Sequence, residues 1–257
     1  MLKFSPANAK TEALSLVKDL KPYLQNGRKI YSLDQLAGWS CPYAKECLTK
    51  VHEINGTRKI EDGPDSIIRC FSATQEVIFT GVYNLRKHNF DIIRKITSDA
   101  EMIKLLQVSM PKDLGILRFH VDGDFLNSKY FYAAINWASL HPDRLFYAYT
   151  KSLPYWVKHR KLVEKIPNFV LTASWGGRRD DLIESEGLRS AKVILSEKEA
   201  GSLPIDHTDE WAANPKKRNK DFTLLIHGQQ QAGSDASKAL QVLRKNKVKH
   251  SYTRKKV

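Results

Sequence analysis

Short apolar segments alternate with helical segments through most of this 257-residue chain, and this alternation limits the folds that the chain can adopt. The apolar segments are rich in β-branched and aromatic residues, as strands are. Strands that alternate with helices form βαβ units, whose parallel sheet is buried on both faces. We therefore predict an α/β fold, a six-stranded parallel partial (βα) barrel. Its strands span 29–33, 115–121, 145–149, 168–173, 192–195 and 222–226, and its helices include 73–87, 127–140, 154–165, 180–186 and 234–245.

The two ends of the chain differ from this pattern. Residues 1–27 carry leucines at helical spacing, which predicts an N-terminal amphipathic helix. Residues 28–245 form one predicted barrel-like domain, and 246–257 form a basic tail. The chain has no long apolar stretch and no secretory signal, so we expect a cytoplasmic protein that does not contact membranes.

The charge distribution suggests a partner. The formal net charge is +14, and from Ala236 to Val257 there are eight Lys or Arg residues and no acid. Contacts between such residues and phosphates release counterions, so a basic tail favours nucleic acid without reading its sequence. A solvated tail that only improves solubility is the alternative.

The three cysteines are Cys41, Cys47 and Cys70. An odd number of cysteines in a chain without an export signal argues for reduced thiols. Three thiolates at one point, with a fourth position open, describe an iron–sulfur or metal site. We predict that the three converge on a [4Fe–4S] cluster, with Zn²⁺ as the alternative. Three small buried apolar side chains would fit the same pattern.

Polar residues follow the predicted strands, where parallel α/β folds place their sites. Asp122, Gly123 and Asp124 follow the second strand. The two carboxylates could hold Mg²⁺ or Ca²⁺, act as a base, or cap the next helix. Lys151 follows an apolar strand, so we expect Asp122 or Asp124 to pair with its ammonium group, in a functional or a structural ion pair.

Later strand ends offer further candidates. Gly176 and Gly177 precede a predicted helix, a geometry in which backbone amides face an anion or a carboxylate. His207 lies between acids, and His227 follows the last strand; each could be a metal ligand, a proton carrier or a hydrogen-bonded core residue. The chain lacks the GxxxxGK[ST], GxGxxG, HExxH and GxSxG motifs, which argues against the commonest nucleotide, zincin and hydrolase sites.

Five segments together resemble the phage gene product 88 family of uncharacterised proteins. The resemblance covers about residues 28 to 243, and the family implies no established chemistry. The segments are 36–42, 69–73, 118–125, 146–152 and 171–177.

The order of the cysteines, strands and acidic motif along the chain is also distantly similar to that in radical S-adenosylmethionine enzymes. Those enzymes have a six-stranded partial barrel, three cluster cysteines after the first strand and a Gly/acid motif after the second. The spacing departs from that family, because 22 residues separate Cys47 from Cys70. The resemblance implies S-adenosylmethionine at an open iron, and its cleavage to a radical that takes hydrogen from the substrate. It implies that Asp122 and Asp124 orient the amino group of the cofactor and that residues 174–177 meet its carboxylate or ribose. Our full set of candidate residues is Asp122, Asp124 and Lys151 for catalysis, and His120, Gly123, Thr150, Ser174, Trp175, Gly176, Gly177, His227 and Gln229 for cofactor binding.

Three functions follow, in order of preference. The first is an iron–sulfur enzyme similar to radical S-adenosylmethionine enzymes, acting on nucleic acid or a nucleotide. The second is a non-catalytic zinc or iron–sulfur protein that binds nucleic acid. The third is a metal-dependent nuclease that uses Asp122, Asp124 and Lys151.

Overall fold

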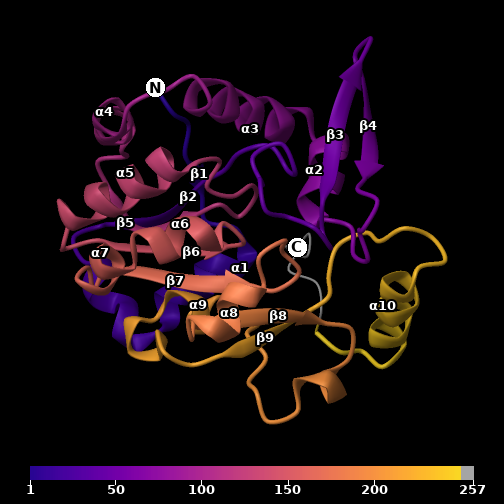
Figure 1. Cartoon of the computed structure of the whole chain (residues 1–257). Coiled ribbons are helices and arrows are strands. Elements are labelled where there is room, and N and C mark those ends of the chain that lie inside the picture. Colours follow the sequence, from indigo (N-terminus) through magenta and orange to yellow (C-terminus); the bar gives the residue numbers. More distant parts are fainter. Residues whose placement is uncertain (250–257) are drawn as a thin grey trace.

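The computed structural model describes residues 1–249, and its centre is a seven-stranded sheet (Figure 1). All neighbouring strands are parallel except β1, which runs antiparallel to β2. This confirms the α/β fold with a mostly parallel sheet. Within residues 1–249 no pairing joins β1 to β9, so the sheet is open, and the partial barrel stays a prediction. The strand order is β1 (Ser5–Pro6), β2 (Lys29–Leu33), β5 (Leu114–Phe119), β6 (Leu145–Thr150), β7 (Phe169–Ser174), β8 (Ser190–Ile194) and β9 (Phe222–Leu225).

Helices cover one face of this sheet. Apolar side chains of β2, β5, β6 and β7, such as Phe119 and Phe146, pack with Trp137 and Phe131 in one buried cluster. Continuous apolar runs in these strands follow from burial on both faces. The helices on this side are α3 (Thr80–Ile93), α4 (Asp99–Ser109), α5 (Ser128–Ser139), α6 (Leu153–Lys158), α7 (Arg160–Glu164) and α8 (Asp181–Ser185).

The N-terminal segment covers the opposite face, but not as the single helix predicted. It consists of α1 (Ala9–Glu12) and two 3₁₀ segments, η1 (Ala13–Leu16) and η2 (Lys18–Leu24). Val17 is extended between the two 3₁₀ segments, and Pro22 lacks the N–H that a helix interior needs. Leu14 and Leu20 are nevertheless fully buried against strand residues such as Ile116. The apolar pattern therefore predicted burial correctly and the helix wrongly.

An antiparallel hairpin separates Cys47 from Cys70, in a stretch for which we predicted no strand. It consists of β3 (Thr49–Ile54) and β4 (Thr57–Asp62), and it projects from the body beside α2 (Phe71–Ile78) (Figure 1). The turn is Asn55-Gly56, and both residues have positive φ, which is the favoured geometry of a two-residue hairpin loop. The predicted helix 73–87 is divided, because α2 ends at Ile78 and the extended residue Phe79 precedes α3.

The C-terminal part completes the sheet and adds its last helix at the β9 edge, while the short helix Glu210–Ala213 packs against β6 and β7. Leu240 and Leu243 of the last helix pack with Leu225 of β9. Residues 250–257 of the predicted basic tail lie outside the described part of the chain. No helix within residues 1–249 is long and apolar enough to cross a membrane. The elements of this part are η3 (Glu197–Ala200), α9 (Glu210–Ala213), η4 (Pro215–Lys217) and α10 (Asp235–Lys245).

Candidate functional site

Hydrogen bonds join the carboxyl ends of consecutive parallel strands. Asp34, directly after β2, accepts a bond of 2.8 Å from the backbone N–H of Val121 after β5. Asp124, in the same loop after β5, accepts bonds from the Thr150 hydroxyl at 2.6 Å and the Lys151 backbone N–H at 2.8 Å. The strand-end segments that the sequence singled out therefore share one edge of the sheet.

The three cysteines come to this edge from two segments, a loop that carries Cys41 and Cys47 and the start of a helix at Cys70. Cys41 lies in a turn, where its carbonyl accepts from the N–H of Ala44 at 3.3 Å. Cys47 precedes β3, and Cys70 is the N-cap of α2, with its N–H donating to the Thr49 hydroxyl at 3.1 Å. All three are free and half-buried.

Their electrostatic coupling shows that the cysteines lie near one another. Burial raises the pKa of the Cys41 thiol well above its usual value, and Asp124, Cys70, Asp122 and Cys47 raise it further. Burial, Asp122 and Cys47 likewise raise the pKa of Cys70. The Cys41 thiol thus lies within electrostatic range of the other two predicted ligands and of both predicted carboxylates. Within residues 1–249, no set of three or more His, Cys, Asp or Glu side chains is placed so that it could hold a metal ion, and the shared metal stays a prediction.

Arg86 of α3, a residue that the sequence analysis did not single out, neutralises Asp122. Its Nη1 lies 2.7 Å from Asp122 Oδ2 and 3.5 Å from Glu76 Oε1, and all three side chains are buried. Glu76 also accepts from the N–H of Ala37 at 2.9 Å, and burial with the neighbouring Asp122 raises its pKa to about 10. Burial also raises the pKa of Asp34, although Arg86 opposes this. One guanidinium therefore serves several buried carboxyl groups.

The predicted pairing of Lys151 with a carboxylate is wrong. Its ammonium group donates to the Ser174 hydroxyl at 2.7 Å and to the Trp175 carbonyl at 2.6 Å, so oxygen atoms after β7 surround it instead. The Asp124 carboxylate has backbone and hydroxyl donors, including the N–H of Phe125 at 2.7 Å. Asp122, Asp124 and Lys151 consequently do not form the single acid–lysine group that a nuclease would use.

The amides of Gly176 and Gly177 face a carboxylate of the chain itself, whereas their predicted contact with a cofactor stays a prediction. Asp180 accepts from the two N–H groups at 2.8 and 2.9 Å. Gly176 has a φ of +90°, and a Cβ there would lie 2.9 Å from Glu46 Oε2, so glycine lets the Cys41–Cys47 loop approach. Because Asp180 occupies these two amides, an added anion at this edge needs other donors.

The histidines differ in their surroundings. His120 is buried and has a φ of +63°. Its Nε2 lies 3.0 Å from the Tyr130 hydroxyl and 3.3 Å from the Gln35 amide nitrogen. Burial and Arg118 lower its pKa to about 3. Burial lowers the pKa of His227 to about 4. His207 is half-buried, and its Nδ1 has no hydrogen-bond partner among residues 1–249. We expect His120 and His227 to be neutral at pH 7.

The end of β9 reaches the Cys70 segment. The ring centroid of His227 lies 4.7 Å from that of Phe71, whereas the predicted contact residue Gln229 is exposed. Gln230, which the sequence analysis missed, accepts from the N–H of Arg69 at 2.7 Å and donates to its carbonyl at 3.0 Å. The last parallel strand thus helps to position Cys70.

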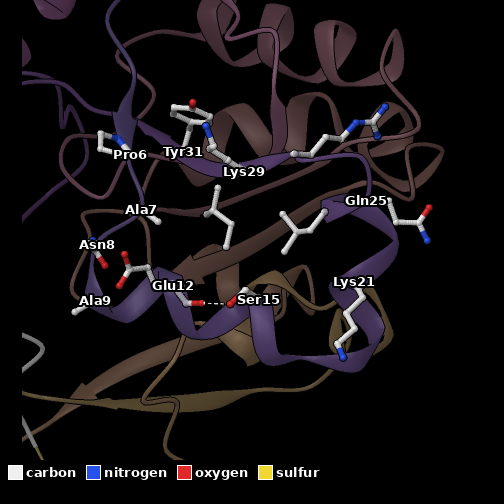
Figure 2. Close-up of a pocket in the computed structure, with 13 residues that line it drawn as sticks. Pro6, Ala7, Asn8, Ala9, Glu12, Ser15, Lys21, Gln25, Lys29 and Tyr31 are labelled. Atoms are coloured by element: carbon white, nitrogen blue, oxygen red, sulfur yellow. Dashed lines mark hydrogen bonds between the residues drawn. The ribbon is translucent and has the colours of Figure 1, made fainter.

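A cavity of about 1120 Å³ lies elsewhere, between the N-terminal segment and β2 (Figure 2). Its lining includes Ala7, Glu12, Lys21 and Ile30. None of the predicted site residues lines it, so this cavity is separate from the cysteine edge.

Comparison with known proteins identifies the family. A family model described as Gene product 88 matches residues 2–245, almost all of the chain. No curated protein matches the chain, and no solved structure does. The matched range contains the cysteines and every strand end described above, and the chain therefore belongs to the gene product 88 family.

Proposed function

We propose that this protein is an iron–sulfur protein in which Cys41, Cys47 and Cys70 bind a [4Fe–4S] cluster, with chemistry similar to that of radical S-adenosylmethionine enzymes. The observation that carries the proposal is that Cys41 interacts electrostatically with Cys47 and Cys70 at the carboxyl edge of a parallel sheet, to which one loop brings Cys41 and Cys47 and the start of α2 brings Cys70. Three cysteine ligands leave one iron of such a cluster open to another ligand.

The charge balance of this edge suits a cation. Arg86 pairs with Asp122, and Glu76 is uncharged at pH 7 because its pKa is raised to about 10, which leaves Asp34 and Asp124 as further buried carboxyl groups of this edge. Iron binds cysteine as thiolate and so lowers the effective pKa of a buried thiol. S-adenosylmethionine carries a sulfonium and an ammonium group, whose positive charges complement the same acids.

The topology supports the finer fold that we propose, a partial barrel. The six parallel strands are neighbours in chain order, which is the order in which a barrel winds. In such a fold the site lies at the carboxyl ends of the strands. Cys41, Cys47 and Cys70 would hold the cluster there, and the cluster would supply the electron needed to cleave S-adenosylmethionine.

Different residues of the chain would bind different groups of S-adenosylmethionine. Asp122 and Asp124 would orient its amino group, because both are fixed by donors and lie near the cysteines. Lys151, beside Ser174, offers a cation for its carboxylate, since Asp180 already occupies the amides of Gly176 and Gly177. His120, Gly123, Thr150, Trp175, His227 and Gln229 remain proposed cofactor contacts.

Cleavage of S-adenosylmethionine tests this function. We expect the anaerobically reconstituted, reduced protein to release 5′-deoxyadenosine, measured by chromatography, and the Cys47→Ser variant to release at least about tenfold less because a thiolate ligand is lost. The exposed Ser139→Ala variant is the control and should match the wild type. Equal product from wild type and Cys47→Ser would contradict the proposal.

The net charge of +14 favours a second candidate function, a zinc or iron–sulfur protein that binds nucleic acid without chemistry. Metal bound to the cysteines without 5′-deoxyadenosine release would favour it. The role of the tail stays a prediction.

A further inference from the structure

The loop that carries Cys41 and Cys47 is joined to the loop after β7 by a short antiparallel bridge. Ala44 pairs with Gly177, and the N–H of Arg178 donates to the Tyr43 carbonyl at 2.8 Å. Ala44 is buried, whereas Lys45 and Arg178, which adjoin the two bridged residues, are exposed and Tyr43 is half-buried.

Two basic residues, Lys45 and Arg178, adjoin the bridged residues, and a third, Lys158, ends α6. Lys45, Arg178 and Lys158 are exposed, and none forms an ion pair within residues 1–249. Their neighbour Arg179 differs, because its guanidinium pairs with Asp181 at 2.8 Å. Cations that no internal acid neutralises remain available to an external anion.

Two tyrosines connect these cations. The ring of Tyr43 lies edge-on against that of Tyr155 of α6, with 5.4 Å between their centroids. Lys158 lies three residues after Tyr155 on the same helix, and therefore on the same side of it. We call Lys45, Arg178, Lys158 and the two tyrosines the basic rim.

We propose that the basic rim binds single-stranded nucleic acid, with Lys45, Arg178 and Lys158 on phosphates and Tyr43 on a base. Cations interleaved with aromatic rings are typical of single-strand binding, because every unpaired base offers a face for stacking. A duplex hides these faces, so the tyrosines favour the single strand.

Binding at the basic rim would hold nucleic acid next to the proposed cluster site. Tyr43 is two residues from Cys41, so a strand on the rim would lie beside the cysteines. Nucleic acid as the substrate class rests on the proposed function; binding to the rim does not.

The test compares two matched triple variants of the full chain. Lys45→Ala/Arg178→Ala/Lys158→Ala removes the rim cations, and Lys95→Ala/Lys104→Ala/Lys112→Ala removes three exposed lysines elsewhere that also form no ion pair. Fluorescence anisotropy with a labelled single-stranded oligonucleotide gives Kd over a range of salt concentrations. We expect the slope of log K against log salt to fall by about 2 in the rim variant, near 0.7 for each lost phosphate contact, and to stay unchanged in the control.

A further variant separates stacking from charge. Tyr43→Leu should weaken single-strand binding by about tenfold or more at an unchanged salt slope. Equal losses of slope in the two triple variants, or unaltered binding by Tyr43→Leu, would overturn the proposal. All variants retain the tail, so its contribution cancels.

The iron content of each protein is measured in parallel. If the wild type contains iron and the rim variant keeps the wild-type salt slope, only the proposal for the basic rim is overturned. Iron-free wild type with a rim-dependent slope would instead overturn the cluster and support the rim.

Discussion

Replacing Asp209 with Asn is expected to lower the free energy of unfolding by about 3–5 kcal/mol, because it leaves buried cations without their counter-charge. Asp209 is fully buried on the sheet face opposite the helices. Its carboxylate pairs with Arg118 of β5 and with Lys10 Nζ at 2.7 Å, and accepts from the Tyr147 hydroxyl at 3.0 Å. The pair with Lys10 also ties the N-terminal segment to the sheet.

Asp209→Asn removes the negative charge of this side chain and keeps its size and shape. Asp209 has a φ of +59°, a conformation that Asn also tolerates. Urea unfolding measures the effect, and Asp143→Asn is the control, because Asp143 is 53% exposed and should cost less than about 1 kcal/mol. A loss for Asp209→Asn no larger than that of the control would contradict the expectation.

The pH dependence has a definite sign. Although burial opposes it, Arg118 and Lys10 hold the pKa of Asp209 well below its usual range. A carboxyl group with a lowered folded-state pKa stabilises the fold above its unfolded pKa, and this stability is lost as the pH falls toward the folded value. The difference between wild type and Asp209→Asn should therefore be constant above about pH 5 and shrink below about pH 4.

The second large effect concerns Arg86. We expect Arg86→Met to lower the free energy of unfolding at pH 7 by about 3–5 kcal/mol, because the buried carboxylate of Asp122 loses its cation. Urea unfolding again measures the effect. Arg94→Met, at an exposed pair with Asp91 on the same helix, should change it by less than about 1 kcal/mol. Equal effects of the two substitutions would show that Arg86 does not neutralise the site.

The sheet was predictable because its strands are buried on both faces. The predicted strand at 29–33 matches β2, and the one at 145–149 lies within β6. Short, mostly apolar segments are typical of strands that are buried on both faces. The hairpin signal Asn55-Gly56 was present in the sequence and would have predicted β3 and β4. The N-terminal segment was harder, because leucine spacing alone does not separate an α-helix from 3₁₀ turns.

The site residues that follow directly after predicted strands could be found from the sequence. Asp34 directly follows β2 and could have been found by the reasoning that selected Asp122 and Asp124. Arg86 could not, because its pairing with Asp122 depends on how α3 packs against the loop after β5. Asp180 lies three residues after Gly177, so its capture of the two glycine amides was a local possibility in the sequence.

Metal analysis of the anaerobically purified protein tests the central claim most directly. The cluster predicts about four iron and four acid-labile sulfide per chain in the wild type. It also predicts the loss of both in the Cys41→Ala/Cys47→Ala/Cys70→Ala variant. One zinc per chain without iron in the wild type, or iron retained by the triple variant, would contradict the claim that these three cysteines hold an iron–sulfur cluster.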